Sequence, residues 1–294
     1  MIQSNLFALT RVVKDYWELS KPRVVALMLV TVVVGMLLAP RTSWSWLVLI
    51  ATLVGISLCA GSAAAINHLL DCHIDAKMQR TQNRPVVKGR VTPIQVLVFS
   101  FIMALVGEGI LYYVVNPLTA GLTFLSLIGY AGIYTGFLKR ATTQNIVIGG
   151  LAGAAPPLLG WTAITNHIDP EALLLVLIIF VWTPPHFWAL ALHRLNDYQK
   201  IEIPMFPVIY GEKLTKLHVL LYVFLLIIVT LLPVLIGMCG KIYFVGVTLL
   251  NLRFLYWAIV LYRQAQPQTA ILTFKYSIYY LFGLFVLLLV DHYL

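Results

Sequence analysis

The chain has 294 residues, of which 61% are hydrophobic and 11% are charged. A soluble domain needs roughly a quarter of its residues charged, so this composition excludes a soluble globular protein and, more firmly, a disordered one. The 20 Lys and Arg residues against 11 Asp and Glu give a net charge of +9, which in a membrane protein reflects loop orientation and contact with anionic membrane lipid; no nucleic-acid partner is expected.

Apolar stretches recur along the chain, each of about 20 residues and therefore long enough to cross a hydrocarbon core of about 30 Å as a helix. Such unbroken runs also exclude a β-barrel, whose strands alternate. The expected fold class is all-α, a polytopic membrane helical bundle of about nine transmembrane helices. In chain order the predicted spans are 24–39, 46–68, 93–115, 118–137, 144–164, 171–193, 217–236, 242–262 and 273–290.

Basic residues are distributed unevenly between the two sides of these spans. If the N-terminus is cytoplasmic, 17 of the 20 Lys and Arg residues fall on cytoplasmic segments, whereas Arg41 and Lys241 fall on the outer side. Lys and Arg accumulate in cytoplasmic loops of membrane proteins. The N-terminus is therefore predicted inside and, with nine spans, the C-terminus outside.

Two predicted cytoplasmic segments, 69–92 and 194–216, are long, polar and charged, whereas other connections are minimal. Long loops on a rigid scaffold commonly carry function, so chemistry is expected there. Four spans separate the two loops. The prediction is a single domain, 1–294, made of two four-helix halves plus a final helix around a central cavity, with no sign of the inverted repeat typical of transporters.

The first loop begins with three oxygen-bearing side chains spaced four residues apart: Asn67, Asp71 and Asp75. On a continuing helix each advances by about 40°, so the three form one stripe. Carboxylate and amide oxygens suit Mg²⁺, which takes further oxygens from substrate phosphates. Basic residues follow at once, which favours a Mg²⁺–diphosphate site. The spacing alone also fits a solvated helix end with local ion pairs.

The second loop closes the sixth predicted span. His186, His193 and Asp197 lie at i, i+7 and i+11, within about 20° of one helical face. Pro184 and Pro185 are expected to kink the span, which membrane helices tolerate where the backbone lines a protein-enclosed or wet cavity. An ordinary packing kink remains an alternative, as does an interfacial polar role for His193. A diphosphate held between the two loops would carry its hydrocarbon tail into the bundle, which requires a lipid-like substrate.

Several longer motifs occur in order around these residues: D-x-x-I-D-x-K-M-x-R-T from Asp71, N-R-P at 83–85, L-K-R at 138–140, G-A-A-P-P-L-L-G at 153–160, P-H-F-W-A-L-A at 185–191 and D-Y-x-x-x-x-I-P-M from Asp197. With the N-x₃-D-x₃-D of the first loop, they resemble the UbiA superfamily of intramembrane prenyltransferases, and within it the branch that farnesylates heme. The resemblance extends from Ser20-Lys21-Pro22 to the last span. One departure is His193, where many members carry the first Asp of a second D-x₃-D motif.

The resemblance implies that heme B, farnesyl diphosphate and water react to give heme O and diphosphate, with Mg²⁺ as cofactor. It implies catalytic roles for Asp71, Asp75 and Asp197, and a metal set of Asn67, Asp71, Asp75 and Asp197. The implied diphosphate partners are Arg80, Arg84, Lys88, Lys139 and Arg140. The implied heme contacts are His186, His193 and Trp188. Aromatic faces that would stabilise a carbocation are Tyr134, Trp161, Phe187 and Trp188, for each of which helix packing is the alternative.

The location implied is a bacterial inner (cytoplasmic) membrane with the active site on the cytoplasmic side, and the implied protein contacts are heme-delivery or heme A synthase proteins. Two other readings stay open. A related enzyme that prenylates an aromatic quinone precursor would share the fold and the metal. A secondary transporter would place coupled charges near the bilayer midplane. Glu108 and Arg253, two charges inside predicted spans, have no assigned role.

Overall fold

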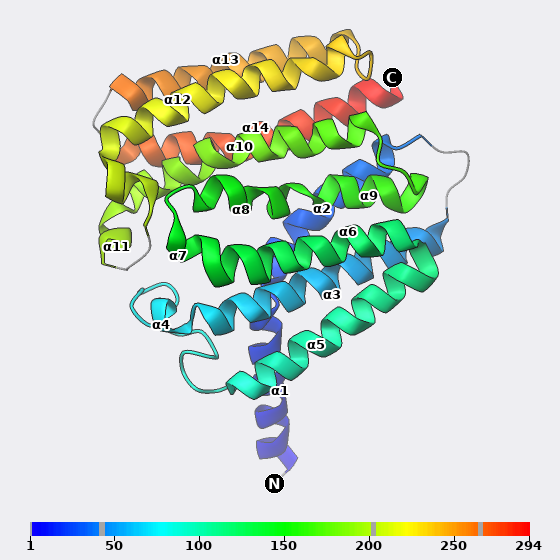
Figure 1. Cartoon of the computed structure of the whole chain (residues 1–294), viewed down its shortest axis with the longest axis vertical. Coiled ribbons are helices and arrows are strands. Elements are labelled where there is room, and N and C mark those ends of the chain that lie inside the picture. Colours follow the sequence, from blue (N-terminus) through cyan, green and yellow to red (C-terminus); the bar gives the residue numbers. More distant parts are fainter. Residues whose placement is uncertain (1, 41–44, 201–203, 264–266) are drawn as a thin grey trace. The chain divides into compact units, whose positions relative to one another are not determined.

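The computed structural model describes residues 2–40, 45–200, 204–263 and 267–294, and every regular element within them is helical (Figure 1). This confirms the predicted all-α fold. The elements, in chain order, are α1 (Ile2–Leu19), α2 (Pro22–Leu38), α3 (Trp46–Leu70), α4 (Cys72–Asp75), α5 (Pro93–Ile110), the π-helix η1 (Leu111–Val115), α6 (Pro117–Leu127), the π-helix η2 (Ile128–Leu138), α7 (Lys139–Ala141), α8 (Asn145–Ala154), α9 (Pro156–Thr165), α10 (Pro170–His193), α11 (Leu195–Gln199), α12 (Phe206–Leu235), α13 (Lys241–Arg263) and α14 (Pro267–Tyr293).

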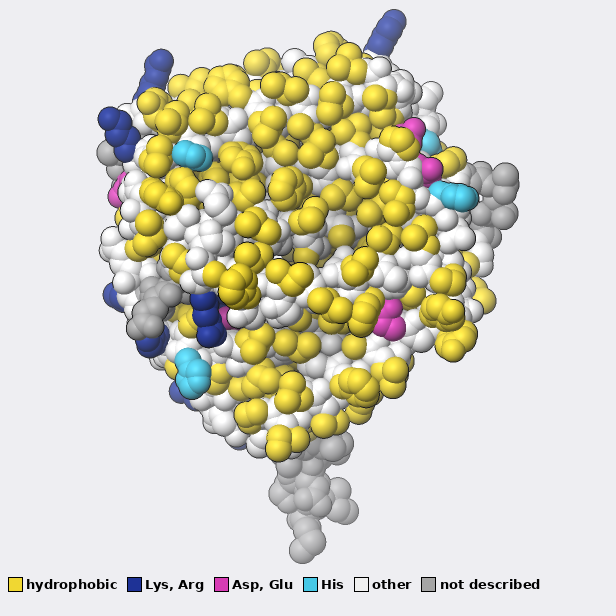
Figure 2. Space-filling model, viewed as in Figure 1, with side chains coloured by type: hydrophobic (Ala, Val, Ile, Leu, Met, Phe, Trp, Pro, Cys, Tyr) yellow, Lys and Arg dark blue, Asp and Glu magenta, His cyan; other side chains and the backbone are white. Residues whose placement is uncertain are grey.

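Eight helical segments of the described chain are long and apolar enough to cross a membrane, and α1 with α2, bent by 51° at the break between them, would make a ninth. The predicted count of about nine is confirmed at eight to nine. Apolar side chains cover much of the visible surface in Figure 2, as expected for helices that face lipid. The chain is an integral membrane protein.

Residues 201–203 of the predicted loop 194–216 lie outside the described residues, and the described remainder differs from the prediction of one long polar loop. Helix α12 begins at Phe206, and Pro207 lies in its first turn. The backbone N–H groups of a first turn have no partner within the helix, so a proline, which has no N–H, costs no hydrogen bond there. Gly211, with a φ of 79°, then interrupts the helical geometry before the apolar run begins. The polar residues that follow Gly211 therefore belong to α12 and not to a loop. Because they are charged, the sequence pattern did not indicate that the helix includes them.

The chain folds as two compact units, of which the first comprises residues 1–30 and 43–137. Its centre is the crossing of α3 and α5, where a Cβ on Gly107 would lie 2.8 Å from the carbonyl oxygen of Gly55. Small residues at such crossings let transmembrane helices approach closely. A cluster of buried residues from α1, α3, α5 and the polar loop holds this loop against the helices: Leu19, Ala65, Val86, Val91 and Val96.

The second unit comprises residues 31–42 and 138–294. In it, α10, α12, α13 and α14 pack against one another, and the second half of α2 lies against α9. A Cβ on Gly160 would lie 2.0 Å from the carbonyl oxygen of Val32, and one on Gly35 would lie 2.0 Å from that of Pro157. The two backbones therefore touch through reciprocal glycines, which gives a structural role to the last residue of the motif at 153–160.

The two unassigned intramembrane charges have neighbours within their own units. The Cys59 thiol donates to Oε1 of Glu108 at 3.5 Å, between α3 and α5. The guanidinium of Arg253 lies over the rings of Tyr256, 4.9 Å from the centroid, and Trp257, at 5.2 Å. Glu108 is thus contacted by a thiol, and Arg253 by two aromatic rings.

Candidate active site

The stripe predicted from Asn67, Asp71 and Asp75 forms, although its helix is not continuous. Helix α3 ends at Leu70 and Asp71 is its C-cap, with φ −89° and ψ 1°. The N–H of Asp71 still bonds the carbonyl of Asn67 at 3.0 Å, and that of Asp75 bonds the carbonyl of Asp71 at 2.8 Å. The four-residue repeat therefore survives the cap. The three residues are only 4%, 2% and 5% exposed, respectively.

Each residue of the stripe has a side-chain partner. Asn67 Nδ2 donates to Oδ2 of Asp71 at 2.7 Å. The guanidinium of Arg84, one of the predicted diphosphate partners, forms an ion pair with Asp75. Lys21 Nζ donates to Oδ1 of Asn67. Buried carboxylates are costly unless paired, so the basic loop stabilises the site as well as carrying charge to it.

Three residues at this site were not assigned a role from the sequence: Lys21, Tyr130 and Thr135. Thr135 accepts from Asn67 Nδ2 at 3.3 Å and donates to the carbonyl of Tyr130 at 2.8 Å. Tyr130 lies within electrostatic range of Asp71 and Arg84. Tyr130 and Thr135 belong to the π-helix η2, and such helices frequently mark functional sites. Only the position of Lys21 at the start of the motif-bearing region gave a signal in the sequence.

The rest of the first loop is held by bonds within the loop and by an ion pair to α1. The Thr81 hydroxyl donates to the carbonyl of Asp75 at 2.9 Å, and Arg90 pairs with Asp15 at 2.9 Å. Arg80 and Lys88, two further predicted diphosphate partners, are exposed on this loop. Burial and the neighbouring Asp75 charge raise the pKa of the Cys72 thiol, so this thiol stays protonated at neutral pH.

In the second unit, the predicted stripe of His186, His193 and Asp197 is broken. Helix α10 ends at His193, and Arg194 leaves the helical region with φ −110° and ψ 27° before α11 begins. The expectation of one helical face through all three residues is therefore wrong, because it assumed a single helix. His193 and Asp197 are both exposed.

His186 is held between α10 and α14. Its ring stacks on Trp182 with centroids 4.2 Å apart and lies 4.6 Å from Phe274, and its Nδ1 is 2.7 Å from the Ser277 hydroxyl. Helix α10 passes through the two prolines without a break between Pro170 and His193. The imidazole ring and one of its nitrogens are thus already in contact with protein groups.

Trp188 lies wholly inside the second unit. It is 0% exposed, with its ring centroid 5.0 Å from that of Phe206 and 5.4 Å from that of Tyr222, both on α12. This environment matches the packing alternative, and a heme contact for Trp188 stays a prediction. The remaining predicted diphosphate partners, Lys139 and Arg140, form α7, where the carbonyl of Lys139 accepts from Asn145 Nδ2 at 3.2 Å.

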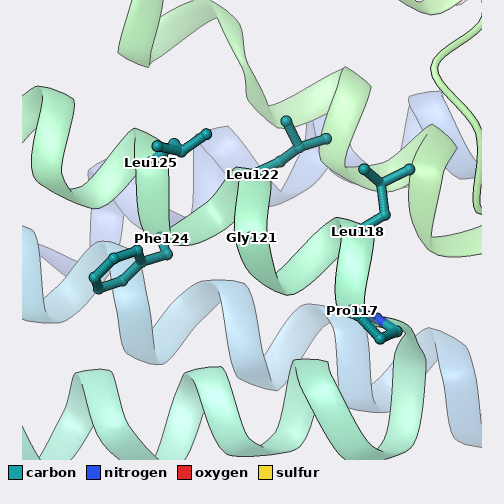
Figure 3. Close-up of a pocket in the computed structure, with 6 residues that line it drawn as sticks. All are labelled: Pro117, Leu118, Gly121, Leu122, Phe124 and Leu125. Carbon is teal, nitrogen blue, oxygen red and sulfur yellow. The ribbon is translucent and has the colours of Figure 1, made fainter.

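A hollow of about 390 Å³ lies along one face of α6 (Figure 3). Its lining consists of Pro117, Leu118, Gly121, Leu122, Phe124 and Leu125. None of these side chains can bind a metal or transfer a proton.

The chemistry of the donor set in the first unit fits a small divalent cation. Two carboxylates and one amide oxygen, all hard ligands, lie together at a helix end beside Lys21 and Arg84. Across the described residues, no three His, Cys, Asp or Glu side chains group as metal ligands. A metal site here would therefore take its third protein oxygen from the Asn67 amide, and oxygens of a bound phosphate would complete it.

Comparison with known proteins decides the family. A family model described as the UbiA prenyltransferase family matches residues 28–286. The chain belongs to this family. Among UbiA relatives, the chain is 61% identical over 281 residues to protoheme IX farnesyltransferase 1 of Pseudomonas fluorescens (strain Pf0-1), covering 96% of this chain and 94% of that protein. It is 62% identical to protoheme IX farnesyltransferase of Legionella pneumophila (strain Lens), covering 95% of each.

Solved structures show the same UbiA fold. A digeranylgeranylglyceryl phosphate synthase aligns with a TM-score of 0.82 and 17% identity, over 95% of this chain and 98% of that one. A UbiA homologue from Archaeoglobus fulgidus, solved bound to GPP and Mg²⁺, aligns with a TM-score of 0.64 and 12% identity, over 93% of this chain and 99% of that one. At these identities the likeness establishes the fold alone.

Proposed function

We propose that this UbiA-family chain acts as a protoheme IX farnesyltransferase, or heme O synthase, converting heme B, farnesyl diphosphate and water to heme O and diphosphate. The observation that carries the proposal is identity of about 60% with proteins of that name over nearly the whole of both chains. Quinone-precursor prenylation would use the same fold, but these relatives favour heme as the acceptor. Clustering of the acidic residues at helix ends in polar loops disfavours a transporter.

In the proposed reaction Mg²⁺ would be held by Asn67, Asp71, Asp75 and Asp197. When bound, this ion would offset the negative charge that develops on the diphosphate as the allylic C1–O bond breaks. Arg84 would donate to phosphate oxygens while it still bonds Asp75. Four further cations would add contacts, two on the first loop and two in α7: Arg80, Lys88, Lys139 and Arg140.

The acceptor is one carbon of a vinyl group of heme. A bond forms between this carbon and C1 of the farnesyl group, diphosphate leaves, and water adds to the cation next to the porphyrin with loss of a proton. Bulk water would quench the farnesyl cation, so the reacting carbons need an apolar pocket. Tyr134, Trp161 and Phe187 are aromatic candidates for stabilising the positive charge.

Heme recognition is assigned to His186 and His193, with Trp188 as a supporting residue of the same helix. His186 lies among aromatic rings, which are suited to packing a flat porphyrin. An enzyme must release its product, so iron ligation by an imidazole would be weak.

The proposed location is a bacterial inner membrane with a cytoplasmic N-terminus and a cytoplasmic active site. The named relatives come from bacteria, which supports this location. Heme B and farnesyl diphosphate are the proposed substrates, and heme-delivery or heme A synthase proteins are the proposed protein contacts.

The test is expression of the chain with a supply of farnesyl diphosphate, followed by heme extraction and mass measurement. Appearance of heme O, and its absence with Asp71→Asn, supports the proposal. Prenylated quinone precursor without heme O would replace it by the related activity. A heme titration of purified His186→Ala and His193→Ala then assigns the heme contact: an unchanged Soret band and affinity with His186→Ala, but altered ones with His193→Ala, would move the contact to His193.

A further inference from the structure

His68 is a buried histidine at the end of α3, beside the stripe of Asn67, Asp71 and Asp75. It lies in the last turn of the helix and is 2% exposed. Among the described residues, neither of its ring nitrogens, Nδ1 nor Nε2, has a hydrogen-bond partner. Buried polar groups in proteins nearly always have a partner, because a group taken out of water without one loses its hydrogen bonds. An imidazole at this position therefore does not serve the stability of the helix.

The helical position of His68 places it between the α1–α2 break and Asp71. Gly61 lies seven residues earlier, within about 20° of the same face of α3. A Cβ on Gly61 would lie 3.4 Å from the Cβ of Ser20, so this face packs against the residues at the break. Asp71 follows His68 by three residues, about 60° around the helix. His68 thus lies on the side of α3 that connects the break with the stripe.

Two cations lie near the imidazole. Lys21 at the break and Arg84 in the first polar loop are both within electrostatic range of His68. Their charges disfavour a metal ion as its partner and favour an anion. An imidazole carries at least one N–H in either protonation state, and this group can donate to an anionic oxygen. A lysine has three N–H donors and an arginine five, so both cations can bind an anion while they keep their bonds to Asn67 and Asp75.

We propose that His68 binds the diphosphate of the prenyl substrate through a ring N–H. The inference rests on the proposed farnesyl transfer and adds a binding residue to that site. A diphosphate has several anionic oxygens, so it can accept from His68 together with Lys21 and Arg84. A site that hydrogen-bonds its substrate through a buried group leaves that group unpaired when the substrate is absent, which is the condition of both ring nitrogens.

The inference predicts opposite effects of an apolar replacement on stability and on binding. Leucine has a volume similar to that of histidine, favours a helix, and removes the two unpaired nitrogens. For His68→Leu we expect the melting temperature of the ligand-free chain to rise by roughly 3–6 °C. Inorganic diphosphate should bind roughly 10-fold more weakly, since it loses a hydrogen bond to a charged acceptor. A histidine with a structural role would instead give a lower melting temperature when replaced.

Two amide replacements test the hydrogen bond itself. His68→Asn and His68→Gln place an N–H near the positions of Nδ1 and Nε2, respectively. At least one of the two should keep the diphosphate affinity within about threefold, and that variant identifies the nitrogen that donates. His73→Leu, the same change at an exposed histidine of α4, is the matched control. It should leave the affinity unchanged and the melting temperature within about 1 °C.

The measurement uses the full purified chain in detergent. Calorimetry follows the binding of inorganic diphosphate at saturating Mg²⁺, and tryptophan fluorescence follows thermal unfolding of the ligand-free chain. An unchanged affinity in His68→Leu would overturn the inference, as would an affinity and a melting temperature that both fall, a loss of affinity that neither amide restores, or no diphosphate binding by the unsubstituted chain. An affinity that depends on His68 in a chain that makes no heme O would keep this inference and reject the proposed acceptor.

Discussion

Replacing Arg84 by methionine is expected to destabilise the protein, because it leaves the Asp75 carboxylate buried without its ion-pair partner. The Asp75 side chain is 7% exposed and that of Arg84 is 23% exposed. Breaking a buried pair by removing one partner costs about 3–5 kcal/mol, and the partial exposure of Arg84 places the expected cost near about 3 kcal/mol. For a chain of this size each kcal/mol corresponds to roughly 2–4 °C, so the melting temperature should fall by roughly 6–12 °C.

A double-mutant cycle separates the charge from the loss of the side chain. Asp75→Asn keeps the shape and an acceptor oxygen, so it should cost about 1–2 kcal/mol. The combination of Asp75→Asn with Arg84→Met removes both charges and should be more stable than the sum of the single changes by at least about 1.5 kcal/mol. Thermal unfolding in detergent, followed by tryptophan fluorescence, measures all three variants.

Arg80→Met is the control, since Arg80 is exposed on the same loop and its loss should stay within about 0.5 kcal/mol. Equal melting temperatures for Arg84→Met and Arg80→Met would refute the reasoning, and so would strict additivity of the cycle. In either case the ion pair between Arg84 and Asp75 would contribute little to the free energy of unfolding.

Three further outcomes are expected. Gly160→Ala should destabilise the chain by about 1–3 kcal/mol or more through its backbone neighbour, whereas Gly153→Ala, where a Cβ meets open space, should be neutral or stabilising by up to about 1 kcal/mol; thermal melting compares them. Heme O formation should stop in EDTA, return with Mg²⁺, and remain absent in Asp71→Asn, whose folding is checked by melting. A periplasmically active reporter fused after Leu294 should give signal and one after Arg90 none; the reverse pattern would invert the proposed orientation.

The contrast between Asp71 and Lys21 shows what the sequence can predict. Asp71 belongs to a repeat of four residues that needs only local helical geometry, and this repeat persists through the end of α3. Lys21 reaches the same site through a helix break and a tertiary contact, which no local periodicity encodes. Thr135 is similarly distant in sequence from Asn67 and meets it only through packing.

Helix ends account for the remaining differences between prediction and structure. The sequence at His193 to Asp197 has no glycine or proline to signal that α10 stops, so it predicts one helical face where there are two helices. At Phe206, conversely, charged residues after Gly211 hide the early start of α12. The number of membrane spans follows from the number and length of apolar stretches, which can be read directly from the sequence. The ends of these helices depend on the backbone angles of single residues, which cannot.

The π-helix η2 makes the length of its span a functional constraint. Its wide turns place the Thr135 hydroxyl on the carbonyl of Tyr130, five residues back, and the same hydroxyl meets Asn67. Deleting one residue would favour ordinary α-helical turns and rotate every later position by about 100°, carrying Thr135 away from Asn67 and changing the direction of the chain that enters α7. Point substitutions along the lipid-facing side of this span should be well tolerated in related sequences, but single-residue insertions and deletions should be rare there.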